Sequence, residues 1–384
     1  MVSVRDPLYG YLELSDEEKA VLDSPQMQRL RRVRQTSLSS LVYPGSTHSR
    51  FTHSLGVMHI AGRMAESMGV GKEEVKEVRL AGLMHDSGHG PFSHTSEKVA
   101  ESHGTSHEDL SKQVIDDLEN LYSADPDRLK RMIEGGTELG SVVAGEVDAD
   151  RMDYLRRDAH NSGLEHGKID YSTVIRLVKH RDGGVCFDQK AVQALESLLM
   201  ARFHMIRSFY THHTSRIAES MLERALRALA DDVGVDELMS MDDRQAHSRL
   251  MSMHSGAAEL YRKAMNRDLY KRALVVDESD ISRNDLKQLS TIDEHSIENK
   301  ISDVAGVEPG SVLVESPTLP KGEQSDAKVL TDSGTTQLSE LSPVPEALEQ
   351  AEWRLAELNI YAPDNLKEQV REASKDILND KIES

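Results

Sequence analysis

The stretch Arg79 to His94, which reads R-L-A-G-L-M-H-D-S-G-H-G-P-F-S-H, decides the architecture of the chain. Its first half has an apolar helical pattern and ends on the adjacent pair His85 and Asp86, after which glycines and a proline in 88–91 break the helix. Imidazole and carboxylate are ligands of borderline divalent metals, but neighbouring helical residues point about 100° apart and cannot close a coordination shell alone. The stretch therefore predicts a metal site to which other segments contribute.

Two other segments can supply the missing ligands. Upstream, R-F-T-H-S-L-G-V begins at Arg50 and places His53 at the start of a helix with apolar periodicity. Downstream, E-V-D-A-D-R-M-D-Y-L-R-R-D is a helical segment with several acidic side chains, any of which could complete the set. Its aspartates are Asp148, Asp150, Asp153 and Asp158.

Composition limits the class of protein. The 384 residues allow one large core and a smaller domain, and 38% hydrophobic with 29% charged residues is typical of a globular chain. No run is long enough to span a membrane and no apolar signal segment begins the chain, so we expect a cytoplasmic protein with no membrane partner. The single Cys186 excludes an intramolecular disulfide and a cysteine-based metal site. The formal charge of −20 does not favour nucleic-acid binding.

The pattern of elements predicts a mainly α fold. A helical core covers residues 1–271 and includes a small β-hairpin over 173–188, followed by one long helical stretch from Gln189 to about Asp231. From residue 272 short β-rich runs alternate with helical stretches, which predicts a small α+β domain over 272–384.

The order His53, then His85 and Asp86, then an aspartate is the H…HD…D signature of the HD-domain metal phosphohydrolases. The chain resembles their dNTP triphosphohydrolase branch, the dGTPase-like and SAM-and-HD-domain enzymes, although we expect no separate SAM domain before the HD core. The resemblance runs from residue 5 to 271, with the HD motif region at about 50–160, and is carried by these stretches: D-P-L-Y-G-Y-L-E-L, P-Q-M-Q-R-L-R, Y-P-G-S-T-H-S-R-F-T-H-S-L-G-V, G-L-M-H-D-S-G-H-G-P-F-S-H, S-H-E-D, D-A-D-R-M-D-Y-L-R-R-D and Y-R-K-A-M-N-R-D-L-Y-K.

The resemblance implies a metal site and a reaction. The ligands would be His53, His85, Asp86 and Asp150, holding a divalent ion that two imidazoles and two carboxylates leave undetermined among Fe, Mn, Zn, Ni and Mg. The implied reaction is attack on the α-phosphate of a dNTP, releasing deoxynucleoside and triphosphate. Candidate catalytic residues are His89, His94 and His107; by pattern alone a histidine at a helix start, as at 107, is more often a polar cap, and the flanking match reverses that preference.

Further residues match positions that line the family's nucleotide pocket. Tyr210 matches the tyrosine that packs against the sugar and disfavours a 2′-hydroxyl, although without the resemblance a buried tyrosine with a satisfied hydroxyl is the simpler interpretation. Thr36 stands where family members can carry an apolar residue, so the base preference stays open. The candidate substrate-binding residues are Gln35, Arg50, Arg151, Tyr154, Asp158, Arg202 and Tyr210.

A second nucleotide site is implied for regulation. A predicted helix that begins after Ser24 and carries several arginines contains Arg31. By charge pattern alone, a solvent-exposed face explains these arginines as well as a binding site does. Val2 and Arg5 depart from the family's lysine and asparagine at neighbouring positions. We expect an activating nucleotide and assembly into a dimer or tetramer, with these residues at the activator site: Asp23, Gln28, Arg31, Arg267 and Lys271.

Two alternatives stay open. The chain could be an HD phosphohydrolase or phosphodiesterase acting on another nucleotide or on single-stranded nucleic acid, which the sugar-pocket residues Gln35, Asp158 and Tyr210 would distinguish. It could also be a nucleotide-sensing regulatory module with an inactive site, against which the complete ligand set argues.

Overall fold

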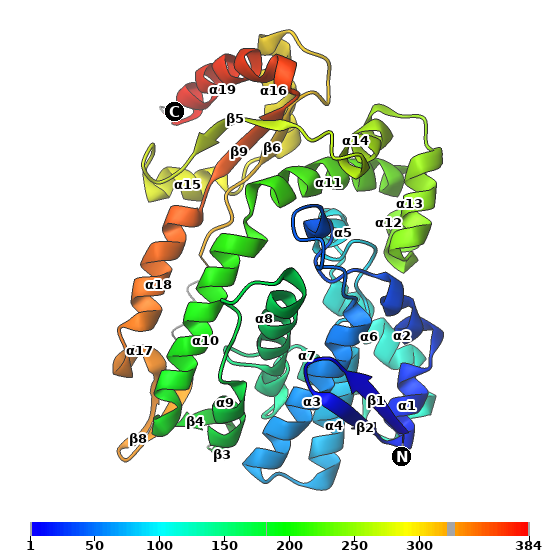
Figure 1. The fold of residues 1–384 in the computed structure, drawn as a ribbon, viewed down its shortest axis with the longest axis vertical. Helices are drawn as coiled ribbons and strands as arrows, with labels where there is room; N and C mark the ends of the chain where they lie inside the picture. The colour runs from blue at the N-terminus through cyan, green and yellow to red at the C-terminus, as the bar shows by residue number, and fades with distance from the viewer. Residues whose placement is uncertain (1, 182, 321–326, 383–384) are drawn as a thin grey trace.

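The computed structural model describes residues 2–181, 183–320 and 327–382, and the mainly α fold predicted from the sequence is confirmed (Figure 1). The chain opens with an antiparallel hairpin of β1 (Val2–Asp6) and β2 (Gly10–Leu14). The short helices α1 (Asp16–Leu22) and α2 (Pro25–Arg29) follow. Ser15 and Glu18 form the capping box of α1, and the hydroxyl of Ser24 caps α2. These side chains accept hydrogen bonds from backbone amides that have no partner within the first turn of a helix.

Two long helices form the centre of the main core. α3 (Arg50–Met68) and α4 (Lys72–Met84) lie side by side, and α8 (Ala149–Ser162) packs against α3. Gly82 permits the close approach of α3 and α4, because a Cβ there would lie 3.3 Å from the backbone of Met58. The remaining core helices are α5 (His94–Glu101), α6 (His107–Asp117), α7 (Pro126–Ile133), α9 (Tyr171–Leu177), α10 (Val192–Met205), α11 (His213–Val233), α12 (Val235–Ser240), α13 (Asp243–Ser252) and α14 (Gly256–Met265).

Two predicted elements differ from the structure. The hairpin predicted over 173–188 consists of β3 (Val178–Arg181) and β4 (Gly184–Asp188), while 173–177 belongs to α9, which Asp170 caps; Asp182 of the predicted turn lies outside the described residues. The single long helix predicted from Gln189 to about Asp231 is interrupted by a π-helical segment, Ile206–Tyr210. Apolar periodicity continues across this interruption, so the sequence pattern did not reveal it.

The C-terminal sheet has the order β5-β9-β6 and is antiparallel. Its strands are β5 (Lys271–Val276), β6 (Leu313–Glu315) and β9 (Leu358–Ala362). α16 (Glu294–Ala305) and α19 (Lys367–Ile382) pack together and against this sheet, with α15 (Arg283–Leu289) beside it, and the group forms one end of the molecule (Figure 1). Its buried residues form a separate hydrophobic cluster.

Residues 327–352 return to the main core. β7 (Lys328–Thr331) pairs in parallel with β4, and β8 (Gly334–Gln337) extends the sheet to the order β3-β4-β7-β8. α17 (Leu338–Leu341) precedes α18 (Val344–Glu352), which packs along α10. The single α+β unit predicted over 272–384 is therefore divided between two sheets, because a strand pattern does not specify which sheet the strand joins. No helix of the described residues is long and apolar enough to cross a bilayer.

Candidate metal centre and catalytic pocket

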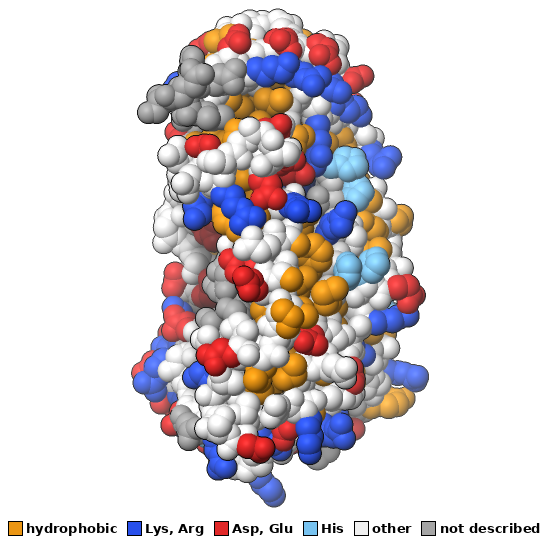
Figure 2. All heavy atoms as spheres, turned by 90° about the vertical axis from the view of Figure 1, so that its left-hand side faces the viewer, with side chains coloured by type: hydrophobic (Ala, Val, Ile, Leu, Met, Phe, Trp, Pro, Cys, Tyr) orange, Lys and Arg blue, Asp and Glu red, His pale blue; other side chains and the backbone are white. Residues whose placement is uncertain are grey.

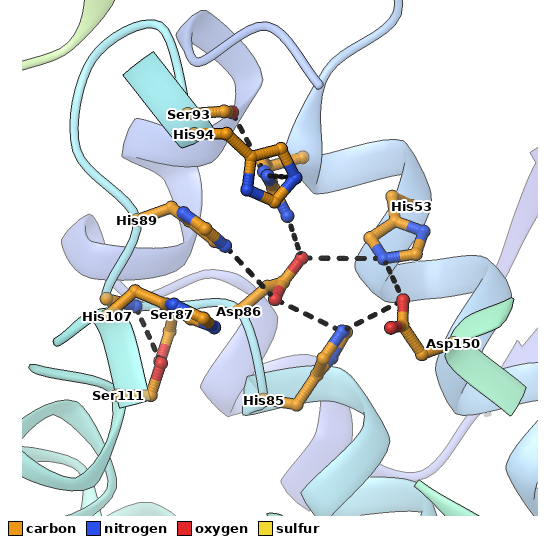
Figure 3. Close-up of polar contacts among 12 residues, drawn as sticks. His53, His85, Asp86, Ser87, His89, Ser93, His94, His107, Ser111 and Asp150 are labelled. Atoms are coloured by element: carbon orange, nitrogen blue, oxygen red, sulfur yellow. Dashed lines mark hydrogen bonds and ion pairs between the residues drawn. The ribbon is translucent and has the colours of Figure 1, made fainter. Parts of the chain in front are cut away.

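Three helices bring the four predicted metal ligands together (Figure 3). His53 lies in the first turn of α3, His85 caps the C-terminal end of α4 with Asp86 directly after it, and Asp150 lies in the first turn of α8. Nε2 of His53 is 2.9 Å from Oδ1 of Asp150 and 3.4 Å from Oδ2 of Asp86. Nε2 of His85 is 3.3 Å from Oδ1 of Asp86 and 3.7 Å from Oδ1 of Asp150.

The hydrogen bonds of the two imidazoles are compatible with a cation at this point. Nδ1 of His53 is 2.8 Å from a carboxylate oxygen of Asp153, and Nδ1 of His85 is 2.9 Å from the carbonyl oxygen of Gly82. Both partners are acceptors, so each Nδ1 donates its hydrogen to them, and each Nε2 would offer its lone pair to a bound cation. Both Nε2 atoms are buried and lack a hydrogen-bond partner among the described residues. Lone pairs that face carboxylate oxygens are compatible with a divalent cation between them.

The four aspartates of the downstream segment have four different surroundings. Asp150 faces the two imidazoles, whereas Asp148 caps α8 by accepting from the amides of Arg151 (2.7 Å) and Gly145 (3.0 Å), and burial raises its pKa to about 7. Asp153 accepts from Nδ1 of His53, on the side of the ring away from Asp150, and Asp158 lines a separate cavity described below. The residue pattern left the choice among the four open and the resemblance indicated Asp150, which is the one of the four that faces Nε2 of both imidazoles.

Arg50 links the cluster to the loop before α5. Its guanidinium contacts Oδ2 of Asp86, donates to the Ser93 hydroxyl at 2.9 Å and lies 3.2 Å from Nε2 of His94. Burial would raise the pKa of Asp86, but Arg50 and the neighbouring histidines hold that pKa well below its usual range. Phe92 and Ser93 both have positive φ, which turns the chain sharply so that α5 begins at His94 beside the cluster.

The other candidate histidines form a second group around Glu97. The ring of His89 stacks on that of His107 with centroids 4.0 Å apart, and Nε2 of His89 is 3.4 Å from Oδ1 of Asp86. Glu97 joins the remaining two, since it contacts Nδ1 of His107 through one oxygen and Nδ1 of His94 (2.8 Å) through the other. Glu97 was not predicted as a site residue, although its position three residues after His94 on a helix is a usable signal.

The histidines differ in protonation. Burial lowers the pKa of the His107 imidazole, but the Glu97 carboxylate outweighs burial and raises that pKa above its usual value. Burial, together with Arg50 and His107, lowers the pKa of His89 well below its usual value. The two stacked rings therefore differ in the direction of their pKa shifts, and of the two His107 is the one that Glu97 favours as a proton donor beside the cluster.

Two cavities meet at the cluster. One, of about 480 Å³, lies over the metal ligands, and another, of about 420 Å³, extends away from them. Gln35, His94 and Tyr154 line both, and Oε1 of Gln35 is buried without a hydrogen-bond partner among the described residues. Arg151 lines the first cavity and is held by the carbonyl of Glu146. The cluster, which could hold a metal ion, therefore borders an elongated pocket.

The second cavity contains three more of the predicted substrate residues. Tyr210 donates its hydroxyl to Oδ2 of Asp158 at 2.6 Å, and Nε2 of His48 is 2.7 Å from Oδ1 of the same carboxylate. Arg202 lines this cavity as well. His48 was not selected from the sequence, since it lies in a polar loop that showed no periodic pattern.

The residues predicted for an activating nucleotide lie in two separate places. Gln28 donates to the carbonyl of Leu22 at 2.8 Å and accepts from Arg31 at 2.8 Å, with Asp23 exposed nearby at the end of α1. Arg267 and Lys271 are exposed beyond α14. Among the described residues no hydrogen bond or ion pair joins the two sets.

One arginine of the basic helix has a structural role that the sequence analysis did not assign. Arg29 donates to the carbonyls of Ser87 (3.0 Å) and His89 (2.7 Å), in the loop after the His-Asp pair, and to that of Met241 (2.8 Å). Burial lowers its pKa to about 10, so it stays charged at neutral pH. Arg29 thus fixes the loop that positions His89.

Comparison with known proteins agrees with this geometry. The HD domain family matches residues 50–158 and the HD-associated region family matches residues 169–384. An uncharacterised protein of Methanocaldococcus jannaschii is 32% identical over 391 residues, covering 100% of this chain and 83% of its own length. A crystal structure of a hypothetical protein from Aquifex aeolicus has a TM-score of 0.78 at 29% identity, covering 97% of this chain and 99% of that one.

The protein belongs to the HD-domain superfamily of phosphohydrolases. Within it, the chain is 34% identical over 248 residues to a Dictyostelium discoideum protein named deoxynucleoside triphosphate triphosphohydrolase SAMHD1 homolog, and 26% identical over 309 residues to the human protein of the corresponding name. These matches cover 58% and 65% of this chain, and about half of each relative: 48% and 49% of their lengths.

Proposed function

We propose that the protein is a metal-dependent deoxynucleoside triphosphate triphosphohydrolase. The observation that carries the proposal is the pair of buried imidazole Nε2 atoms, on His53 and His85, that face carboxylate oxygens where a cation fits and open into a pocket containing the Tyr210–Asp158 pair. The relatives named triphosphohydrolases support the same reaction class. A divalent cation held there would supply a nucleophilic water at neutral pH and neutralise charge on phosphorus.

In the proposed reaction, water adds to the α-phosphorus and the bond from that phosphorus to O5′ breaks. The leaving O5′ needs a proton, and His94 lies at the border of the two cavities, where this bond would lie. We assign proton delivery to His94 and His107, which Glu97 connects, with His89 packed against them. Arg50 and Arg151 would stabilise the negative charge of the triphosphate.

The second cavity would hold the nucleoside. Asp158 would accept from the 3′-hydroxyl of the sugar, Tyr210 would pack against the sugar where a ribonucleotide carries its 2′-hydroxyl, and Gln35 offers an unpaired amide oxygen. Arg202 and Tyr154 complete the walls. Acidic and basic side chains are intermingled on the face shown in Figure 2, and the formal charge of −20 does not favour a nucleic-acid partner, so we expect a free nucleotide as substrate.

Product analysis tests the proposal. Purified protein is incubated with each dNTP and NTP in the presence of Mn²⁺, Fe²⁺, Zn²⁺, Ni²⁺ or Mg²⁺, and products are separated by chromatography. We expect deoxynucleoside and triphosphate, with dNTPs preferred over NTPs. Monophosphate and pyrophosphate, hydrolysis of other phosphoesters alone, or no turnover with any metal would contradict it. Asp158→Asn should raise the KM for dNTPs, because it removes the charged acceptor of the 3′-hydroxyl, and Asp170→Asn, at the exposed cap of α9, is the matched control.

Activation by a second nucleotide is a separate proposal. We propose that the residues around Gln28 and the exposed pair Arg267 and Lys271 contact one nucleotide across a subunit interface, in a nucleotide-linked dimer or tetramer. Sedimentation velocity with and without GTP or dGTP and metal tests this. An increase in mass together with a faster rate is expected, whereas unchanged mass and rate would contradict it.

A further inference from the structure

The N-terminal motif Asp6-Pro7-Leu8-Tyr9 has no part in the proposed reaction, yet it is anchored to the metal centre. It forms the turn between β1 and β2, which Asp6 closes by accepting from the amides of Leu8 (2.8 Å) and Tyr9 (3.1 Å) through Oδ1. Its other oxygen accepts from Nη1 of Arg157 at 2.9 Å. The turn thus contacts α8 through a buried ion pair.

From Arg157 the contacts continue to a metal ligand. Nε and Nη2 of Arg157 donate to the two oxygens of Asp153, each at 2.8 Å, and the Tyr9 hydroxyl donates to Oδ1 of Asp153 at 2.8 Å. Oδ2 of Asp153 also accepts from Nδ1 of His53 at 2.8 Å. The residues from Asp6 to His53 form one unbroken chain of charge-assisted hydrogen bonds, so a change at the turn can reach the ring that faces the cation.

The hydrogen-bonded residues that link Asp6 to His53 are buried. The exposed fractions are 0% for His53 and Asp153, 1% for Arg157 and 4% for Asp6. A Cβ on Gly56 would lie 1.9 Å from Oδ1 of Asp153, so α3 leaves no space in which the carboxylate could move. In such a setting water does not screen the charges, and each group depends on its neighbours for orientation.

The direction of the effect follows from the charges. Asp153 makes His53 a better ligand because it accepts from Nδ1 and increases the electron density at Nε2. Arg157 reduces that effect because its positive charge stabilises the same carboxylate and lowers its strength as an acceptor. The negative charge of Asp6 partly neutralises Arg157 and so limits this reduction. When Asp6 loses its charge, Arg157 is neutralised by Asp153 alone, so Asp153 becomes a weaker acceptor for His53 and the site binds a cation more weakly.

We propose that the Asp6–Tyr9 turn is a positioning element of the metal centre, which sets the affinity for the divalent cation through Arg157 and Asp153 and couples the order of the N-terminal hairpin to metal binding. The inference rests on the proposed metal-dependent function. Because coupling between two sites is reciprocal, cation binding should in turn stabilise the hairpin.

The test measures Mn²⁺ affinity of the full chain by electron paramagnetic resonance of free Mn²⁺, without substrate. Asp6→Asn keeps the turn's acceptor oxygen and removes the charge, and we expect affinity to fall about tenfold, at the low end of what loss of an outer-shell partner costs. Tyr9→Phe should give a smaller loss. The matched control is Glu18→Gln, which removes a carboxylate of similar burial whose partner, Arg79 (2.9 Å), lies outside the metal centre, and its Mn²⁺ affinity should equal that of the wild type.

A second measurement uses the wild type alone and covers the case in which Asp6→Asn does not fold. Hydrogen exchange of the amides in β1 and β2 should slow when Mn²⁺ is added. Wild-type Mn²⁺ affinity in Asp6→Asn would overturn the inference, and so would hairpin exchange that is unchanged by Mn²⁺. Either result would leave the proposed function standing. A wild type that binds no Mn²⁺ and hydrolyses no dNTP with any metal would instead overturn the proposed function.

Discussion

The metal centre and the C-terminal sheet are both well buried, but they bury opposite kinds of side chain. Around His53 the core encloses charged groups such as Arg50, Asp86, Asp153 and Arg157, each at most 4% exposed. The C-terminal sheet and its helices enclose aliphatic side chains, for example Ile301 and Ile360, each 0% exposed. Burying charges is costly unless they are paired or bind an ion, whereas burying aliphatic groups is favourable in itself. The first region therefore points to chemistry and the second to stability.

The largest effect on activity should come from the ligands themselves. Asp86→Ala or His85→Ala should remove both bound metal and turnover, with a loss of a thousandfold or more in rate, on the order of the several kcal/mol that a catalytic metal contributes. Metal content by mass spectrometry and product release measure both. Wild-type-like turnover in either variant would mean that the cluster is not the catalytic centre.

Loss of the proton donor should be smaller and should spare the metal. His107→Gln is expected to lower kcat by about 10²- to 10⁴-fold, the range of general acid–base catalysis, while metal content stays at the wild-type level. His103→Gln is the matched control, because His103 is exposed and its Nδ1 contacts only local groups. Equal rates for the two variants would remove His107 from the mechanism.

A pH profile examines the Glu97 pairing more finely. The Glu97 carboxylate raises the pKa of His107, so the protonated form persists to higher pH, and activity falls as pH rises through that pKa. In Glu97→Gln this stabilisation of the charged form is lost and the pKa of His107 falls. The alkaline limb of the kcat profile should therefore move to lower pH, and an unmoved limb would show that the pairing does not control the reaction.

A substitution in the core of the C-terminal sheet should change stability without changing metal binding or turnover. Ile301→Ala should lower the free energy of unfolding by about 2–5 kcal/mol through the cavity it leaves, with metal content and kcat of the folded enzyme unchanged. Denaturant unfolding and steady-state rates measure the two effects. Loss of metal at temperatures where the variant is folded would mean that the two regions are coupled.

The sequence predicted the positions of the candidate ligands on their helices more closely than the pairing of the strands, for a physical reason. Local sequence signals mark the pair His85 and Asp86, with the helix breakers after it, and the motif that carries Asp150. The helices that bear the candidate ligands could therefore be predicted from the sequence. His48 contacts Asp158 from a distant loop with no distinctive pattern, and the contact of Glu97 with His107 joins two helices, so only the spacing of Glu97 from His94 was visible in the sequence. The partner of a strand is also non-local, which is why β7 was expected in a C-terminal domain although it pairs with β4.

The central claim is that α3, α4 and α8 bring four side chains to one cation. Anomalous diffraction from crystals grown with Mn²⁺, recorded at the manganese edge, tests it most directly. The account predicts one strong peak between Nε2 of His53, Nε2 of His85 and the carboxylates of Asp86 and Asp150. A peak among His89, His107 and Glu97 instead, or no peak in a crystal of active enzyme, would contradict it.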